Sequence, residues 1–400
     1  MSEVEDCKRW LDEMMPKIID SLGPNIDEAR YERLEFNGIF IMSTVYRVRL
    51  QYINKANGKN EELLMILKRP MLRFNQVAYV HLQFRNEILF YETFSPDESF
   101  AKYLYAEERP PGDSIIALED VNKRGYHTSY LYNPPLEYTL SAIRELGRFH
   151  GKGYAMKELQ PEKFFDMVSR IEEVRYEKKE LNIYEDYCNT MPLRAVEYLR
   201  DQNYDAAFCD KMIALLSKAF DNVMLKVVQP SEPLATLCHG DFTLTNILYK
   251  REDDGQLRAM LIDFGLIRYS SPVIDLSTYL FLCCSNETRR GNFTEIMRTY
   301  HDALKEYLLD AGVRDIEKYS YDALLDDFKI NASYGFLIAS CFLHLIFEYI
   351  TPETLIQDVL DLGTLEGARK QKYLGGDTIS KLLADMLLHL NELGCLKRYC

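Results

Sequence analysis

The chain has 400 residues, of which 47% are hydrophobic and 28% charged, a balance typical of a globular protein with a sizeable core. Its formal net charge of −14 argues against nucleic acid or an anionic membrane as a partner, because phosphate contacts require Lys and Arg. The nine cysteines show no CxxC pair and no zinc-type spacing, which indicates a reducing compartment.

The N-terminal stretch MSEVEDCKRWLDEMM is charged and lacks the apolar centre of a secretory signal, so we expect a cytoplasmic protein. The longest apolar run, 332–350, contains His344 and Glu348 and is barely long enough to cross a bilayer. We interpret it as a buried helix and expect no membrane insertion. The sequence gives no indication of an oligomeric state.

Residues 1–121 are predicted to form a small, β-rich N-terminal lobe with a helical extension at its start. The dipeptide Asn57-Gly58 is a strong turn signal between two β-rich runs, and the second run ends at Lys68. The expected elements are a helix within 1–35, strands over 45–52 and 63–67, a helix over 80–95 and a strand over 114–119.

Residues 122–400 are predicted to form a larger, mostly helical lobe with a short β-rich insert over 234–268. The fold class is therefore α+β, with two lobes, and the order of elements is that of a protein-kinase-like fold. The expected helices cover 138–157, 162–179, 191–199, 210–228 and most of the chain after 275.

The most informative motif lies in the β-rich insert. The stretch His239-Gly240-Asp241 is followed by Asn246 five positions after the aspartate, which is the spacing of a kinase catalytic loop. A strand then delivers Asp263 in an Asp-Phe-Gly sequence. Phosphoryl transfer needs a positioned hydroxyl and metal-held phosphates, and these residue types supply both.

Each residue of this motif is assigned a role. Asp241 is predicted to accept the proton of the substrate hydroxyl, and His239 to position the loop without acting as a base. Asn246 and Asp263 are predicted to bind Mg²⁺, because this hard cation prefers oxygen ligands. The predicted cofactors are ATP and Mg²⁺.

The predicted contacts to ATP lie in the N-terminal lobe. Lys68 closes an apolar strand, where a kinase places the lysine for the α- and β-phosphates, and Glu87 on the next helix can pair with it. Glu92 is the alternative partner. Backbone groups of Glu119, Asp120 and Val121 are expected to meet adenine as the hinge between lobes. The phosphate-covering loop, 37–44, keeps one glycine, and its backbone amides and the hydroxyl of Ser43 or Thr44 could contact phosphates.

With these motifs, the sequence resembles the ecdysteroid kinase-like family, which is expanded in insects and related to choline kinases and aminoglycoside phosphotransferases. The resemblance runs from about residue 36 to 350. Its most specific pieces are the stretch 239–246 and the segment 262–280, in which Asp275 matches a buried acidic position. The resemblance implies ATP-dependent phosphorylation of a hydroxyl on a small molecule, an ecdysteroid or a related apolar alcohol.

Two other interpretations remain open. The poor glycine loop is compatible with a weak or inactive kinase-like protein that binds and sequesters a small ligand. A protein kinase is disfavoured, because Gly240 replaces the arginine of the His-Arg-Asp motif and the segment between Asp263 and Asp275 is short. Aromatic residues after 278 could line the acceptor site or belong to the core: Tyr279, Phe281, Tyr334, Phe336, Phe342, Phe347 and Tyr349.

Overall fold

The computed structural model describes residues 3–35, 42–94, 98–109, 113–177 and 182–399. Within them the chain divides into two compact units, Met1–Tyr126 and His127–Cys400. Each unit has its own core and is described by itself.

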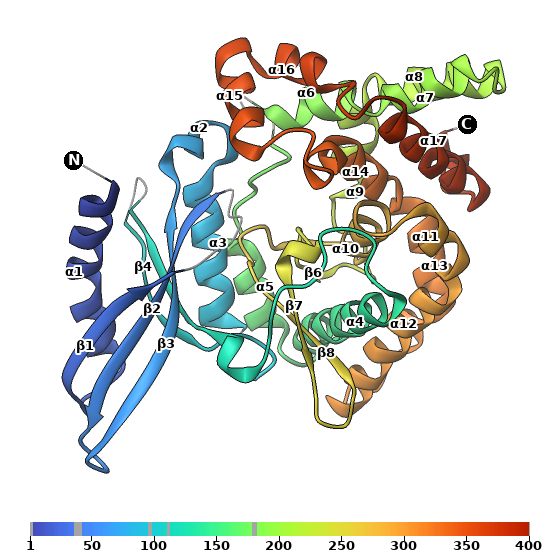
Figure 1. Cartoon of the computed structure of the whole chain (residues 1–400). Coiled ribbons are helices and arrows are strands. Elements are labelled where there is room, and N and C mark those ends of the chain that lie inside the picture. The colour runs from blue at the N-terminus through green and yellow to red at the C-terminus, as the bar shows by residue number, and fades with distance from the viewer. Residues whose placement is uncertain (1–2, 36–41, 95–97, 110–112, 178–181, 400) are drawn as a thin grey trace. The chain divides into compact units, whose positions relative to one another are not determined.

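Unit 1 is built on a five-stranded antiparallel sheet with strand order β1-β2-β3-β5-β4 (Figure 1). The turn at Asn57-Gly58 joins β2 to β3 as the sequence predicts, with Asn54 opposite Lys59 in the register. The elements are α1 (Glu3–Ser21), β1 (Ile26–Leu34), β2 (Ser43–Asn54), β3 (Lys59–Pro70), η1 (Leu72–Phe74), α2 (Asn75–Ala78), α3 (Val80–Thr93), β4 (Tyr103–Glu107), β5 (Ile115–Glu119) and η2 (Val121–Arg124).

The core of unit 1 lies between α1 and the sheet. Trp10, Met14 and Ile18 of α1 are fully or nearly buried against Met65 and Leu67 of β3. Because side chains alternate along a strand, Lys68 points to the opposite face of the sheet. On that face it meets α3, so the strand's alternation places the lysine beside Glu87.

The helix predicted within residues 1–35 ends at Ser21, and residues 26–34 form strand β1 instead. Gly23 has a φ of +106°, which stops the helix. The charged sequence IDEARYERL suits a helix by local propensity, but pairing with β2 decides its conformation. Strand β4 was not predicted from the sequence either.

Unit 2 is mostly helical, with two small β-ribbons inserted among the helices. Helices α4 (Leu136–Leu159) and α12 (Phe293–Asp310) lie side by side (Figure 1), and a Cβ at Gly147 would come within 2.5 Å of the Tyr300 carbonyl oxygen. A glycine is therefore needed where these two helices touch.

The helices that precede the β-ribbons of unit 2 are α4 (Leu136–Leu159), α5 (Pro161–Arg170), α6 (Ile183–Thr190), α7 (Leu193–Asp201), α8 (Ala206–Leu216), η3 (Phe220–Met224) and α9 (Leu225–Val227). The insert contains β6 (Thr236–Cys238), η4 (Leu244–Asn246), β7 (Ile247–Arg251), β8 (Leu257–Leu261) and β9 (Arg268–Ser270). After it come α10 (Val273–Thr278), η5 (Tyr279–Cys283), α11 (Asn286–Gly291), α12 (Phe293–Asp310), η6 (Glu317–Tyr319), α13 (Tyr321–Asn331), α14 (Ser333–Ile346), α15 (Pro352–Leu362), α16 (Thr364–Gln371), α17 (Gly376–Glu392) and η7 (Lys397–Tyr399).

The helix predicted over 162–179 stops at Arg170. The Glu173 carboxylate accepts hydrogen bonds from the backbone N–H groups of Arg175 and Tyr176, at 2.8 and 3.0 Å. Such a side-chain-to-backbone turn competes with the helix, and it turns the chain toward β9. The helix predicted over 210–228 is also broken, after Leu216.

Among the described residues, no single helix is long and apolar enough to span a membrane. Helices α13 and α14 pass that test only as a pair, and they are bent by 51° at their junction. Most side chains of α14 are buried within unit 2, as expected for a core helix.

Candidate active site

The His-Gly-Asp stretch forms the loop that leaves β6. Gly240 has a φ of +79°, and a Cβ there would lie 1.8 Å from the Leu266 carbonyl oxygen. Both the backbone conformation and the close approach of Leu266 require glycine. The arginine that protein kinases carry at this position cannot be accommodated in this loop.

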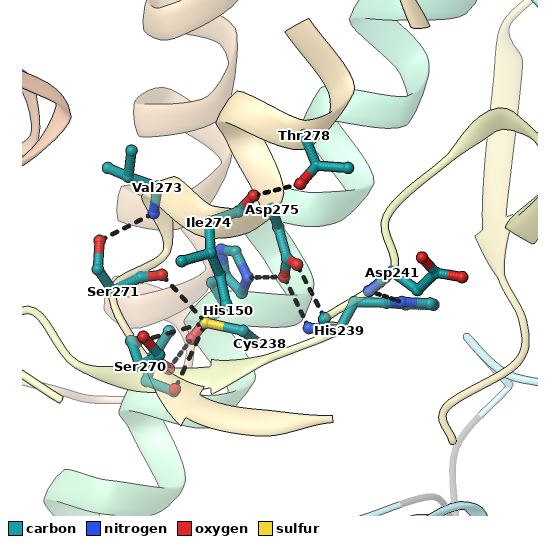
Figure 2. Close-up of polar contacts among 12 residues, drawn as sticks. His150, Cys238, His239, Asp241, Ser270, Ser271, Val273, Ile274, Asp275 and Thr278 are labelled. Carbon is teal, nitrogen blue, oxygen red and sulfur yellow. Dashed lines mark hydrogen bonds and ion pairs between the residues drawn. The ribbon is translucent and has the colours of Figure 1, made fainter. Parts of the chain in front are cut away.

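A buried carboxylate, Asp275 of α10, holds the loop in place (Figure 2). Its Oδ2 accepts a hydrogen bond from the His239 backbone N–H at 2.6 Å, and its Oδ1 accepts one from the Gly240 N–H at 2.8 Å. The Asp275 side chain is 1% exposed. Hydrogen bonds to a charged group are stronger than those between neutral groups, so Asp275 holds the backbone of the loop firmly in place.

His150 of α4 is the third partner of Asp275, with 3.0 Å between Nε2 and Oδ2. Burial lowers the pKa of His150, although Asp275 acts in the opposite direction, so the ring is neutral near pH 7. The neutral ring then donates from Nε2 to Asp275 and accepts from the Tyr300 hydroxyl at Nδ1, 2.7 Å away. Burial raises the pKa of Tyr300 well above its usual value, which keeps that hydroxyl protonated.

His150, Cys238 and Asp275 lie close enough together to suggest a metal site. Their hydrogen bonds indicate a different role. The Cys238 thiol bonds to the carbonyl oxygens of Ser270 and Ser271, each at 3.3 Å, and burial raises its pKa well above the usual value. A protonated thiol is a poor metal ligand, so this cluster is structural support for the loop.

The fully buried His239 ring links the loop to the strand that precedes Asp263. Its Nε2 lies 3.0 Å from the Ile262 carbonyl oxygen, so it donates there, and its Nδ1 accepts the Asp241 backbone N–H at 3.3 Å. The ring also packs on Phe264, with 5.0 Å between centroids. These contacts support the predicted positioning role, because both ring nitrogens are already bonded to the backbone.

Asp241 and Asn246 are joined directly. The Asn246 amide Nδ2 donates to the Asp241 carboxylate Oδ2 at 3.0 Å and to its backbone carbonyl at 2.9 Å. This leaves the Asn246 Oδ1 as the atom that would meet a cation. The Asp241 side chain is 33% exposed, so part of the carboxylate remains accessible.

Asp263 follows β8 and has a φ of +67°, a conformation that few non-glycine residues adopt. Its neighbour Ile262 is bonded to the loop that contains Asn246, because the Ile262 N–H donates to the Asn246 carbonyl at 3.0 Å. Asn246 and Asp263 offer an amide oxygen and a carboxylate, a donor set that fits Mg²⁺.

Arg175 was not predicted from the sequence. Its Nη2 lies 3.2 Å from the Asp241 Oδ1, and its Nη1 donates to the Gly240 carbonyl at 3.2 Å. Burial disfavours its charge, but Tyr184, Asp241 and other neighbours raise the pKa of Arg175 well above its usual value. Arg175 is 66 residues from Asp241 in the chain, and no spacing rule connects the two.

In unit 1, the Lys68 ammonium contacts the Glu87 Oε2 at 2.5 Å, and both side chains are buried. The alternative partner, Glu92, is exposed. Ser43 is the first residue of β2 and pairs with Pro70 in the sheet register. The covering loop before it, residues 36–41, lies outside the described residues.

The predicted hinge runs from the end of β5 into η2. The N–H groups of Glu119 and Asp120 already donate to the carbonyls of Lys102 and Leu64, at 2.9 and 3.0 Å. The Asp120 carboxylate contacts Arg47 at 2.5 Å and caps η2. An adenine contact from this segment would therefore use its carbonyl groups or Val121, and that contact remains a prediction.

Together, the antiparallel sheet of unit 1, the mostly helical unit 2 and the His-Gly-Asp loop define a protein-kinase-like fold. The sequence matches the ecdysteroid kinase-like family over residues 37–313, and the chain belongs to that family. No curated protein sequence matches the chain.

Several solved structures are similar to the chain at low identity. Wild-type aminoglycoside 2'-phosphotransferase-IIIa in its GDP complex is 14% identical, with coverage of 93% of this chain and 99% of that chain and a TM-score of 0.42. The ethanolamine kinase of Plasmodium vivax is 11% identical, with coverage of 96% and 86% and a TM-score of 0.40. Likenesses this weak carry no argument about substrates.

Proposed function

We propose that the chain is an ATP-dependent phosphotransferase that phosphorylates a hydroxyl group of a small molecule. The observation that carries the proposal is the partly exposed Asp241 carboxylate, which accepts a hydrogen bond from Asn246. Asp275 holds the backbone of the same loop through two hydrogen bonds. Family membership supports the same reaction. A loop held this firmly suits a reaction that depends mainly on positioning.

In the proposed reaction, Asp241 accepts the proton of the acceptor hydroxyl while the hydroxyl oxygen attacks the γ-phosphorus of ATP. The bond between that phosphorus and the bridging oxygen breaks, and ADP leaves with the bonding electrons. Asn246 and Asp263 would hold Mg²⁺, which supplies positive charge to the phosphates. Lys68, fixed by Glu87, would pair with the α- and β-phosphates.

We propose an ecdysteroid or a related apolar alcohol as the acceptor. Family membership supports this class, and two aromatic side chains of unit 2, Tyr184 and Phe342, are only partly buried near the loop. Tyr184 was not predicted from the sequence, and most of the aromatic candidates that were predicted belong to the core. Tyr279, Phe281, Tyr334 and Phe336 are at most 1% exposed.

The test is ATP consumption by the wild-type protein and the Asp241→Ala variant with Mg²⁺, against hydroxylated steroids, choline-like amines and aminoglycosides. Mass spectrometry should detect phosphate on one acceptor with the wild type and none with the variant. Binding of ATP–Mg²⁺ without transfer to any acceptor would favour the ligand-binding alternative. Lys68→Met serves as the nucleotide control, because it should weaken ATP binding and leave Asp241 untouched.

A further inference from the structure

We propose that Arg175 determines acceptor specificity by keeping acceptors that carry an ammonium group away from Asp241, so that the enzyme prefers neutral alcohols. The inference rests on the proposed function and narrows its substrate class. It is carried by a cluster in unit 2 formed by Arg175, Arg268, Glu173, Tyr176 and Tyr184. All five side chains come from the segment 173–184 or from β9.

The first argument concerns the carboxylates. One common site for an ammonium group is a carboxylate whose charge is not already balanced by another cation. Asp241 already faces the Arg175 guanidinium, at 3.2 Å. Glu173 contacts Arg268 at 2.5 Å, and its other oxygen accepts two backbone N–H groups. Burial acts to raise the pKa of Glu173, but Arg268 and these N–H bonds lower it, so this carboxylate is ionised and paired.

The second argument concerns the aromatic faces, which are the other common binding site for ammonium groups. The Arg175 guanidinium carbon lies 5.3 Å from the centre of the Tyr184 ring. The Arg268 guanidinium carbon lies 4.6 Å from the centre of the Tyr176 ring. Both rings therefore already carry a cation over one face, and a third cation would be repelled.

The third argument concerns where the two arginines are held. Burial of the guanidinium groups leaves little water to screen their charge, since the side chains of Arg175 and Arg268 are each 11% exposed. The buried Nε of Arg175 and the buried Nη1 of Arg268 have no hydrogen-bond partner among the described residues. Two N–H groups of the cluster are therefore buried without an acceptor among the described residues, so hydrogen bonds do not fully balance its positive charge.

The partly exposed aromatic residues beside the cluster suit the hydrocarbon part of a neutral alcohol. Tyr184 of α6 and Phe342 of α14 have ring centroids 6.4 Å apart, and both are partly exposed. An alcohol could rest its hydrocarbon surface on these ring edges while its hydroxyl reaches Asp241. A neutral hydroxyl is not repelled by Arg175, and it can donate to Asp241 while that contact persists.

The test uses two alcohols of the same shape, choline and 3,3-dimethylbutan-1-ol, in which a carbon replaces the charged nitrogen. Each is assayed as an acceptor with ATP and Mg²⁺, and as a competitor of any larger acceptor that the wild type phosphorylates. We expect wild type to prefer the neutral alcohol by at least about tenfold in kcat/KM or in inhibition constant. Arg175→Gln should remove most of that preference, and Arg175→Lys, which keeps the charge, should retain it.

The matched control is Arg289→Gln. Arg289 is a fully buried arginine of the same unit that contacts His389 and Asn286, so its loss tests for general damage. Thermal melting of each variant verifies folding. A wild type that prefers choline, or a preference that Arg175→Gln leaves unchanged, overturns the inference while the kinase function stands. Failure of every alcohol in spite of bound ATP–Mg²⁺ contradicts the proposed function, and the inference falls with it.

Discussion

The two sides of the loop from His239 to Asn246 have opposite environments. On the buried side, Asp275 is 1% exposed and accepts hydrogen bonds from two backbone N–H groups and one neutral histidine. On the open side, Asp241 is 33% exposed and meets Asn246 and Arg175. The two aspartates therefore differ in what they can bind. Fixed donors surround Asp275, whereas part of the Asp241 carboxylate remains accessible to another molecule.

This comparison suggests that the two sides respond differently to substitution. Removing charge from the open side should affect transfer and leave folding nearly intact. Removing charge from the buried side should affect both, because donors without acceptors in a low-dielectric interior are costly. The following experiments test that separation.

The largest expected effect is on transfer by Asp241→Asn. The amide keeps the shape and one oxygen for Arg175, and its NH₂ group faces Asn246 at a partly exposed position where water can replace the lost bond. The amide cannot take the hydroxyl proton, so kcat should fall by about a thousandfold. The free energy of unfolding should change by less than about 1 kcal/mol. Steady-state kinetics and urea unfolding measure the two quantities. A large loss of stability would show that the open side is also structural.

Asp275→Asn should lower stability by about 3 kcal/mol and also reduce kcat. An amide has one acceptor oxygen, so its NH₂ group must face the N–H of His239 or Gly240. Asp327→Asn is the matched control, because Asp327 is buried but accepts from the Ser271 hydroxyl, which can reverse its bond, and from the Asn331 amide, which can rotate to present its oxygen. Urea unfolding of both variants should show the larger loss for Asp275, and equal losses would contradict the comparison.

Gly240→Ala should destabilise the protein by at least about 2 kcal/mol more than Gly255→Ala. Both glycines have a positive φ, +79° and +83°, but only at Gly240 would a Cβ meet another atom, the Leu266 carbonyl oxygen. The difference in the free energy of unfolding between the two variants therefore measures the cost of the steric clash with Leu266. Thermal and urea unfolding measure it, and similar losses would remove the steric argument for the His-Gly-Asp motif.

The smallest effect concerns His344, another buried histidine, which lacks an aspartate partner like that of His150 among the described contacts. Burial, with Arg194 as a further cause, lowers the pKa of His344 to about 4 from its usual 6.5. Above pH 6.5 both states are neutral. Between pH 6.5 and 4 only the unfolded chain gains the proton, so stability should fall by at most about 1.4 kcal/mol per pH unit.

The measurement for His344 is the free energy of unfolding at pH 7 and pH 5 in wild type and His344→Gln. The difference between the two pH values should be smaller in the variant. His127→Gln is the control, because this histidine is exposed and its replacement should leave the pH dependence as in wild type. An unchanged pH dependence in His344→Gln would show that this histidine does not contribute.

The sequence predicted the parts of this protein that depend on neighbours in the chain. The hairpin at Asn57-Gly58 and helix α4 are confirmed, because a turn dipeptide and apolar periodicity act over a few residues. The loop from His239 to Asn246 is likewise local, since Asn246 reaches Asp241 five residues away. The spacing of the motif therefore accounts for the contact between Asp241 and Asn246, whereas the need for glycine at position 240 comes from the Leu266 carbonyl, which only folding brings close.

Only the tertiary structure decided the rest. Residues 26–34 form a strand because they pair with β2. Residues 171–177 do not continue helix α5, because the Glu173 carboxylate accepts hydrogen bonds from the N–H groups of Arg175 and Tyr176. The same turn brings Arg175 to Asp241 across 66 residues. Local propensity and spacing cannot report such contacts, because their free energy depends on burial and on partners that only folding brings together.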